Sequence, residues 1–327
     1  KSAAISVGWT APRFATSQFG GIYTQCTGMK FSGALGVNVR RICRFSSKNS
    51  NPSFRFSRGQ CPCPTSGDVF LWGPNDHRFC EDGLMTKHVP DYGPRARIGI
   101  AVPHSNPTVE PEIRMTLPDN IGVYATRLTH ASESVETRLN HYIRNIPLAI
   151  NSFGEIRLAA FGFGCTGSSY VAGLENEENF TSKAYNETSV PVITAAQAIR
   201  KALDQIGCSS IALVSPYPDW LAELGYEYWE ASGLKIMDRL RVDPTLTDTH
   251  RIYELTSQDA LDQMRKLKET DADCIVASGT GMPTLKAVRT LSSETGIPVL
   301  SSNLSLAWAL TKIVSPEQAP PLPQDLL

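Results

Sequence analysis

Two stretches of the chain share one pattern, and this pattern decides the fold. The first reads Ile98-Gly-Ile-Ala-Val-Pro103-His104, and the second reads Ile211-Ala-Leu-Val-Ser-Pro216-Tyr217. Each is a short apolar run that ends at a proline, which is typical of a buried strand that leads into a loop. Two copies of such a strand in one chain indicate a duplicated unit.

Two further pairs of segments repeat in the same order. Phe163-Gly-Cys165-Thr-Gly167 matches Ala277-Ser-Gly279-Thr-Gly281, and Val190-Pro-Val-Ile-Thr194 matches Ile297-Pro-Val-Leu-Ser301. The spacing between the first and second motif also agrees to within one residue in the two halves. We infer two lobes related by an internal duplication, that is, a pseudo-two-fold pair.

Short β-branched runs alternate with longer helical patterns from Arg97 onward, which is typical of βαβ units around a mostly parallel sheet. Amphipathic helices are predicted at 135–150, 195–206 and 258–268. Eight strands are predicted, four in each lobe: 97–103, 121–127, 158–164, 191–194, 210–215, 234–240, 273–278 and 297–301. The sequence therefore predicts an α/β fold, with a first lobe over 92–195 completed by 300–320 and a second lobe over 196–299.

The first 84 residues differ in composition from the rest. They hold ten Lys or Arg against four Asp or Glu, are rich in Arg, Ser and Gly, and lack regular periodicity. We expect a poorly structured N-terminal extension over 1–84, either a transit peptide or an accessory segment that precedes Met85. The pair Cys61 and Cys63 lacks the second ligand pair that a zinc site needs.

The whole chain has a formal net charge of -1 and a mean hydropathy of -0.18. Neither value points to nucleic acid or to a membrane surface, and no apolar run approaches the roughly 18 residues of a membrane-spanning helix. The three cysteines beyond the extension have no disulfide-like spacing, so a reducing compartment is expected. We predict a cytoplasmic protein, with organellar import through 1–84 left open.

Cys165 is the candidate reactive residue. It follows an apolar strand and precedes a turn into a helix, and Gly164 and Gly167 permit close approach of the backbone there. A helix N-terminus stabilises a thiolate, so we expect the pKa of Cys165 to fall from about 8.5 into the range of roughly 3.5–7.5. Cys208 and Cys274 are expected to be structural.

Glycine and threonine residues follow the matched strands and offer backbone N–H groups and hydroxyls but no fixed cation. Such a set suits a carboxylate or an enediolate oxyanion. Ligands of parallel α/β sheets bind beyond the carboxyl ends of the strands, so we expect Cys165 and Gly279 on opposite sides of one ligand. The candidate binding residues are Thr166, Gly167, Gly279, Thr280 and Gly281.

Two more residues follow the repeated first strands of the lobes. Asn106 can donate to a substrate carboxylate or serve as the cap of the following helix. Tyr217 can point its hydroxyl into the cleft or pack beside Pro216 and Pro218. No P-loop, dinucleotide-binding turn, nucleophile elbow or zinc motif is present in the sequence.

Taken together, these motifs resemble the aspartate/glutamate racemase superfamily, in its maleate isomerase and arylmalonate decarboxylase branch. The resemblance runs from about Arg97 to Leu310. It implies two flavodoxin-like lobes, no metal or organic cofactor, and chemistry at the carbon next to a carboxylate. The segments that carry it are Val102-Pro-His-Ser-Asn106-Pro-Thr-Val-Glu110, Gly164-Cys165-Thr-Gly-Ser-Ser, Ser215-Pro-Tyr217 and Ser278-Gly-Thr-Gly-Met-Pro-Thr.

The resemblance also assigns roles. Cys165 is similar to the nucleophile of maleate isomerases, Asn106 to their carboxylate-binding asparagine, and Tyr217 to their second-lobe tyrosine. Gly279 stands where the racemases have a second cysteine. Because one thiol serves only one face of a substrate, racemisation with two bases is not expected.

The leading expectation is a cysteine-dependent isomerase of a small dicarboxylate, similar to maleate cis-trans isomerase. A decarboxylase of a substituted malonate, or a racemase-type enzyme that transfers a proton on one face, is the second possibility. A non-catalytic binder of small carboxylates is the third. The expected partners are a small carboxylate and a second copy of the chain, with no nucleic acid and no membrane.

Overall fold

The computed structural model of the chain describes residues 22–26, 43–47 and 89–322. Strands β1 (Ile22–Cys26) and β2 (Cys43–Ser47) pair antiparallel. The sequence predicts no regular element there, so this strand pair differs from the prediction. The expectation for the rest of 1–84, including the Cys61 and Cys63 pair, lies outside the described residues.

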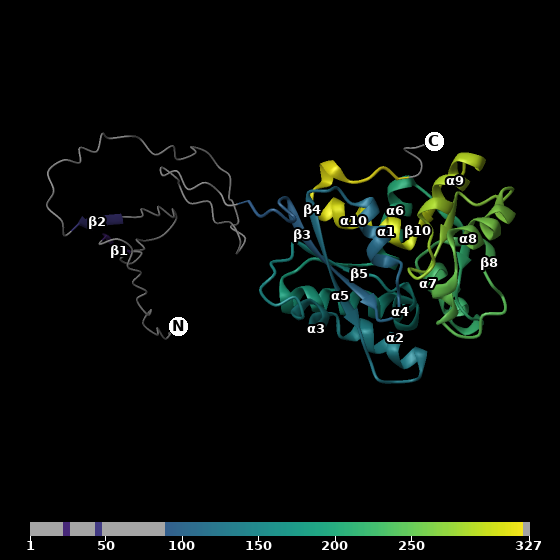
Figure 1. The fold of residues 1–327 in the computed structure, drawn as a ribbon, viewed down its shortest axis with the longest axis horizontal. Coiled ribbons are helices and arrows are strands. Elements are labelled where there is room, and N and C mark those ends of the chain that lie inside the picture. The colour runs from purple at the N-terminus through teal and green to yellow at the C-terminus, as the bar shows by residue number, and fades with distance from the viewer. Residues whose placement is uncertain (1–21, 27–42, 48–88, 323–327) are drawn as a thin grey trace, which may run out of the picture. The chain divides into compact units, whose positions relative to one another are not determined.

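Residues 89–322 contain a first run of alternating strands and helices (Figure 1). Its elements are β3 (Ala96–Pro103), α1 (Val109–Thr116), β4 (Ile121–Leu128), α2 (Val135–Arg144), α3 (Ile146–Asn151), β5 (Ala160–Phe163), α4 (Thr166–Ala172), α5 (Leu174–Thr188), β6 (Val192–Thr194) and α6 (Ala195–Ile206).

A second run repeats the pattern. Its elements are β7 (Ser210–Ser215), α7 (Asp219–Ala231), β8 (Lys235–Arg241), η1 (Arg251–Glu254), α8 (Ser257–Met264), η2 (Arg265–Leu267), β9 (Cys274–Ala277), α9 (Leu285–Thr295), β10 (Val299–Ser301), α10 (Ser302–Val314) and η3 (Pro316–Gln318).

The two runs build two four-stranded sheets with the same topology. The first has the order β4-β3-β5-β6 and the second β8-β7-β9-β10, and every neighbouring pair in both is parallel. Each repeated motif of the sequence therefore falls on the equivalent strand of its sheet. The predicted α/β fold with two four-stranded parallel sheets is confirmed, and all eight predicted strands are present.

The sheets are covered on both faces, which is why their inner strands are apolar throughout. In β3 the side chains of Ile98, Ile100 and Val102 are fully buried. In β9 the side chains of Ile275 and Val276 are fully buried as well. Both strands lie in the middle of their sheets, so they fix the position of the loops that follow them.

Two predicted helices differ from the structure at their ends. The helix predicted over 135–150 is divided into α2 and α3 at Asn145, because Pro147 has no N–H to continue the hydrogen-bond ladder. The helix predicted over 258–268 is α8 followed by the 3₁₀ turn η2. The break at Asn145 leaves α2 as a short helix of its own.

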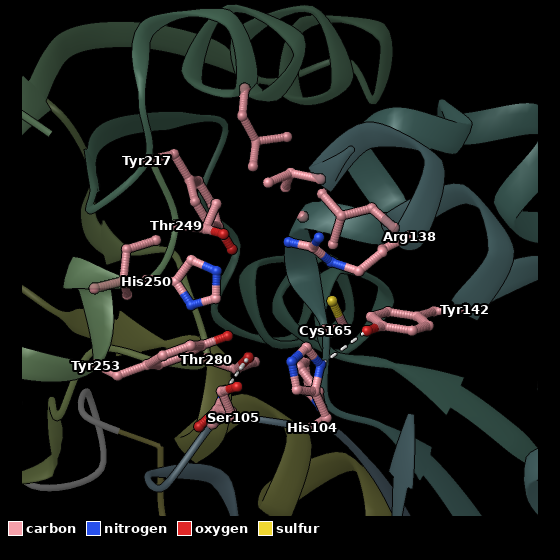
Figure 2. A pocket seen from close by; sticks show the side chains of 18 residues that line it. His104, Ser105, Arg138, Tyr142, Cys165, Tyr217, Thr249, His250, Tyr253 and Thr280 are labelled. Atoms are coloured by element: carbon pink, nitrogen blue, oxygen red, sulfur yellow. Dashed lines mark hydrogen bonds between the residues drawn. The ribbon is translucent and has the colours of Figure 1, made fainter. Parts of the chain in front are cut away.

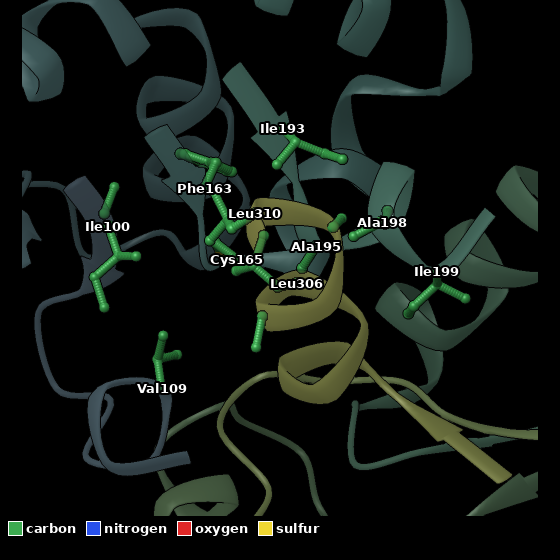
Figure 3. Packing of buried hydrophobic residues seen from close by; sticks show 14 of the residues in the cluster. Ile100, Val109, Phe163, Cys165, Ile193, Ala195, Ala198, Ile199, Leu306 and Leu310 are labelled. Carbon is green, nitrogen blue, oxygen red and sulfur yellow. The ribbon is translucent and has the colours of Figure 1, made fainter. Parts of the chain in front are cut away.

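Helix α10 comes from the end of the described chain and packs on β5 of the first sheet (Figure 3). A Cβ atom on Gly162 would lie 2.8 Å from Cδ1 of Leu310, so glycine permits this close packing. The sequence analysis expects residues 300–320 to complete the first lobe, and α10, which lies in this range, does contact the first sheet. The lobe boundaries at 92–195 and 196–299 stay a prediction.

A buried carboxylate ties α1 of the first run to the second sheet. Oε1 of Glu112 accepts hydrogen bonds from the N–H groups of Thr284 (2.6 Å) and Leu285 (2.9 Å), at the start of α9. Its Oε2 accepts from Nδ2 of Asn303 at 2.8 Å, and the same Nδ2 lies 3.1 Å from the carbonyl oxygen of Thr280. Glu112 therefore fixes the loop after β9 relative to α1.

Candidate active site

A cavity of about 60 Å³ opens at the carboxyl ends of the strands of both sheets (Figure 2). Asn106 follows β3, Cys165 and Gly167 follow β5, Tyr217 follows β7, and Thr280 and Gly281 follow β9. The duplicated topology therefore brings equivalent loops of the two sheets to one place. Six of the eight predicted site residues line this cavity.

Cys165 lies at the start of α4 and is 5% exposed. Ser168 donates its hydroxyl to the Cys165 Sγ at 3.2 Å, and the N–H groups of Gly167 and Ser168 also point to the sulfur. Burial nevertheless raises the pKa of Cys165, because it outweighs these three donors. The expected lowering of this pKa is therefore wrong in direction, since the strand end is much drier than the sequence suggests.

Thr166 and Gly279 were predicted to bind substrate, but neither lines the cavity. Oγ1 of Thr166 lies 3.0 Å from Oγ of Ser302, and the N–H of Gly279 donates to the same Ser302 oxygen at 2.9 Å. Both residues are thus tied to the start of α10, behind the cavity wall. Their contribution is to hold the two strand-end loops together.

Gly279 adopts a backbone φ of +128°, which residues with a side chain rarely adopt. A Cβ atom there would lie 2.7 Å from Cγ and Cδ of Pro216 and 3.6 Å from Cζ of Tyr217. The predicted second-lobe residues that do line the cavity are Tyr217, Thr280 and Gly281. This corrects the expectation that Gly279 itself faces Cys165 across the ligand.

Asn106 lines the cavity and is held by hydrogen bonds at both ends of its amide. Its Oδ1 accepts from the N–H groups of Thr108 (2.9 Å) and Val109 (3.3 Å), so it caps the start of α1. Its Nδ2 donates to Oγ1 of Thr280 at 3.3 Å, and that hydroxyl donates to the carbonyl oxygen of Gly164 at 2.8 Å. These hydrogen bonds fix the orientation of the amide, and its donation to Thr280 links the loop after β3 to the loop after β9.

Tyr217 is buried and packs edge-to-face on Tyr170, with ring centroids 5.9 Å apart. Burial raises the pKa of Tyr217 well above its ordinary value, and the nearby Tyr170 and Cys165 raise it further. The phenol is therefore protonated at neutral pH and acts as a hydrogen-bond donor. Tyr217 is therefore packed, as one of the two possibilities held, and it also lines the cavity; the direction of its hydroxyl into the cleft stays a prediction.

The family model for arylmalonate decarboxylase matches residues 98–324 of the chain. The chain belongs to this family. The match covers both four-stranded sheets except for the first two residues of β3, and it covers every residue that lines the cavity. The resemblance inferred from the sequence motifs is thereby confirmed.

This family member is also similar to curated maleate isomerases. It is 24% identical to the maleate isomerase of Geobacillus stearothermophilus over 232 residues, which are 66% of this chain and 90% of that protein. It is 28% identical to the maleate isomerase of Nocardia farcinica over 229 residues, which are 66% of this chain and 89% of that protein.

Solved structures agree with the fold. A cysteine-to-serine mutant of the Nocardia farcinica maleate cis-trans isomerase, with a covalently bound succinylcysteine intermediate, superposes with a TM-score of 0.60 at 25% identity. The superposition covers 67% of this chain and 92% of that one. A crystal structure of arylmalonate decarboxylase, 20% identical, superposes with a TM-score of 0.55 over 68% of this chain and 93% of that one.

The family member also has cavity residues that sequence reasoning missed. One group lies on a single face of α2, at the helical spacing of three and four residues: Val135, Arg138, Leu139 and Tyr142. The amphipathic pattern of this helix is visible in the sequence, but it does not tell a face on a cavity from a face on the core. The other group lies after β8, in a turn and in the 3₁₀ helix η1, and has no periodic sequence signal: Thr249, His250, Ile252 and Tyr253.

His104 also lines the cavity, and its Nδ1 lies 3.1 Å from the hydroxyl of Tyr142 (Figure 2). Burial raises the pKa of Tyr142, and the proximity of Cys165 raises it further. Within the described residues, no group of three or more His, Cys, Asp or Glu side chains is placed to hold a metal ion. None of the described helices has the length and apolarity needed to cross a membrane.

Proposed function

We propose that this chain is a cofactor-independent cis-trans isomerase of a small dicarboxylate, with Cys165 as the nucleophile. One observation carries the proposal. The thiol lines a cavity whose nearby polar groups are hydrogen-bond donors, and no carboxylate is among the residues that line it. Such surroundings favour an anionic substrate beside the sulfur.

In the proposed reaction the Cys165 thiol first loses its proton to water. The thiolate then adds to one alkene carbon, and the electron pair of the double bond moves through the other carbon onto its carboxylate, giving an enediolate. What was a double bond is now single, so the adduct rotates. The electron pair returns, the C–S bond breaks, and the trans acid and the thiolate are released without net change of atoms or electrons.

The residues around the sulfur suit these steps. The N–H groups of Gly167 and Ser168, together with the Ser168 hydroxyl, stabilise the thiolate. The amide of Asn106 has a second N–H besides the one that it donates to Oγ1 of Thr280, and we assign this second N–H to an enediolate oxygen. The Thr280 hydroxyl donates to the carbonyl oxygen of Gly164, so its role is to orient the Asn106 amide from the opposite sheet. A single thiol suffices, which agrees with the absence of a side chain at Gly279.

The relatives support the same chemistry. The Nocardia farcinica structure contains a succinylcysteine, which is the adduct of a thiol with a four-carbon dicarboxylate. An addition of this kind needs a nucleophilic cysteine, and Cys165, which lines the cavity at the start of α4, is the candidate in this chain. The proposal extends this chemistry to the present chain.

Decarboxylation of a substituted malonate is the second candidate. It is favoured by the raised pKa of Cys165, because a thiol that keeps its proton can act as the acid that protonates an enediolate. An apolar flank of Val135, Leu139, Leu221 and Ile252 could also receive an aryl group. In this reaction the product takes up a solvent-derived proton on one face only.

Proton NMR in D₂O separates the two candidates. Maleate, phenylmalonate and aspartate are incubated with the full chain in separate tubes, beside Cys165→Ala and the control Cys208→Ala, whose thiol lies outside the cavity. We expect conversion of maleate to fumarate by the parent and Cys208→Ala and none by Cys165→Ala. Loss of CO₂ from phenylmalonate without maleate conversion would establish the decarboxylase instead, and full activity of Cys165→Ala would refute both.

A further inference from the structure

Arg138 is the one formally charged side chain among the eighteen residues that line the cavity. No fixed cation was expected at the site from the sequence, because the motifs near Cys165 contain none. Arg138 comes instead from the middle of α2, on the same face as Val135, Leu139 and Tyr142. The site therefore has a positive charge that the proposed reaction has not used.

The guanidinium group is held by one edge. Its Nη1 donates to the carbonyl oxygens of Ser132 and Glu133, both at 2.8 Å, in the segment just before α2. Neither Nε nor Nη2 has a hydrogen-bond partner within the described residues, and no carboxylate there pairs with Arg138. A cation that is positioned on one edge and unpaired on the other is suited to an anion from outside the chain.

Across the cavity from Arg138 lie Thr249 and His250, as Figure 2 shows. They belong to the segment after β8 of the second sheet, where Oδ1 of Asp248 accepts from the N–H of His250 at 2.6 Å and so shapes the turn. The hydroxyl of Thr249 and the imidazole of His250 are hydrogen-bond donors. An anion placed beside Arg138 would thus meet donors from both sheets.

We propose that Arg138, Thr249 and His250 form a second anion subsite, which binds the substrate carboxylate that takes up no charge during the reaction. This inference rests on the proposed function, since it supposes that the other carboxylate becomes the enediolate near Cys165 and Asn106. It assigns the substrate class, a dicarboxylate with one anionic group at each subsite. The two carboxylates of an arylmalonate are joined to one carbon, whereas those of a four-carbon cis-dicarboxylate lie on neighbouring carbons and are farther apart, which suits two separate subsites better.

Arginine is the side chain expected for this task. Its planar fork binds a carboxylate through two parallel N–H···O bonds, whereas lysine offers a single point charge. Part of the surrounding wall is apolar, with Val135, Leu139 and Leu221 beside the guanidinium region. The lower local dielectric strengthens the ion pair relative to one in open water.

The test measures binding of unreactive ligands by isothermal titration calorimetry with the full chain. Succinate carries two carboxylates, and butyrate lacks one of them. The variants are Arg138→Met, which removes the charge at similar length, and Arg138→Lys, which keeps the charge and loses the fork. Arg144→Met is the matched control, because Arg144 lies on the same helix, is exposed and does not line the cavity.

We expect Arg138→Met to weaken succinate binding by about 10- to 100-fold, as for a charge-assisted hydrogen-bonded pair. Arg138→Lys should lose less affinity for succinate than Arg138→Met, and Arg144→Met should bind succinate as tightly as the parent. Butyrate should bind equally weakly to the parent and to Arg138→Met. Equal loss of both ligands in Arg138→Met, or equal affinity of the parent for both, would overturn the subsite.

Maleate turnover separates this inference from the reaction on which it rests. If maleate is not converted but the selective loss of succinate binding is found, the subsite stands and the proposed reaction falls. If maleate is converted by Arg138→Met with the KM of the parent, the reaction stands and the subsite falls.

Discussion

A Cβ atom on Gly279 would lie 2.7 Å from two ring carbons of Pro216, so the backbone after β9 has no room for a side chain. The φ of +128° imposes the same restriction independently. The equivalent position after β5 is Cys165, whose φ of -144° is ordinary extended backbone. The duplicated fold thus has a thiol at this equivalent position in one sheet only, which supports the proposed chemistry on one face of the substrate.

Replacing Gly279 should therefore destabilise the protein without creating a second catalytic thiol. We expect Gly279→Ala and Gly279→Cys to lose about 1–3 kcal/mol from the backbone conformation and a similar amount, about 1–3 kcal/mol, from the overlap with Pro216. The measurement is the free energy of unfolding from urea denaturation. Exchange of the α-proton of aspartate in D₂O should stay absent in Gly279→Cys.

Gly207→Ala is the matched control for this prediction. Gly207 has a φ of +72°, but nothing lies within 4 Å of its added Cβ atom. Gly207→Ala should therefore lower the free energy of unfolding only by the cost of the backbone conformation, about 1–2 kcal/mol. Equal losses in Gly207→Ala and Gly279→Ala would show that Pro216 moves aside easily, and the site could then accept a side chain.

The pH dependence of Cys165 follows from the direction of its pKa shift. Burial disfavours the thiolate, so the fraction of thiolate at neutral pH is smaller than for a free cysteine. The rate of alkylation by iodoacetamide should rise with pH through a midpoint above the ordinary value of about 8.5. Peptide mass spectrometry identifies Cys165 among the other cysteines.

Ser168→Ala sharpens the same measurement. It removes the hydroxyl that donates to Sγ at 3.2 Å, so the pKa of Cys165 should rise further and alkylation at a fixed pH should slow. A midpoint near or below 7 in the parent would mean that the N–H groups at the start of α4 outweigh burial. In that case the thiolate would be preformed, as the sequence alone suggested.

Asn106 allows its two roles to be tested separately. Asn106→Asp keeps an oxygen to accept from Thr108 and Val109, but it replaces the donor to the cavity by a negative charge. We expect unfolding free energy close to that of the parent and a KM for maleate raised by about 10- to 100-fold. Asn106→Ala should lose about 1 kcal/mol of stability in addition, because the cap is gone.

Two roles are supported if Asn106→Asp raises KM and leaves the unfolding free energy unchanged. If stability and KM change together in both variants, the amide nitrogen has no separate role, and Asn106 is only a cap. If KM is unchanged in Asn106→Asp, the enediolate lies elsewhere in the cavity.

The sequence predicted the strands, and the position of Cys165 at the end of one of them, because both depend on local patterns. Apolar runs that end at Pro103 and Pro216 specify buried strands, and the match between Cys165 and Gly279 specifies their common place in the two halves. Arg138 could not be found in this way, because its role depends on which face of α2 meets a cavity. Tertiary packing determines which face of α2 meets the cavity, and the helical periodicity of the sequence does not show it.

The direction of the pKa shift of Cys165 could not be predicted from the sequence either. A helix N-terminus beside Cys165 is visible in the chain, but the burial that opposes it is contributed by side chains from distant segments such as Tyr217. The same holds for Gly279, where the obstacle is Pro216, a residue 63 positions away in the chain. Contacts over such separations follow only once the two sheets are placed against each other.

Glu112 gives a final prediction, on how the two sheets are joined. Its buried carboxylate accepts from the first N–H groups of α9 and from Asn303, which in turn reaches the carbonyl oxygen of Thr280. Glu112→Gln puts an NH₂ group where only donors point, so one buried donor loses its acceptor. We expect a loss of about 1–3 kcal/mol in unfolding free energy and a raised KM, since the loop that carries Thr280 loosens.

Glu110→Gln is the control for this substitution, because Glu110 stands on the same helix and pairs with Arg127 at the surface. An exposed ion pair contributes about 0–1 kcal/mol, so its removal should change stability little. Comparing the two variants in urea separates the connection between sheets from the general effect of losing a negative charge in α1. Equal effects of the two would mean that Glu112 acts only through its charge at the start of α1, and that the loop after β9 is held by Thr108 and Ser302 instead.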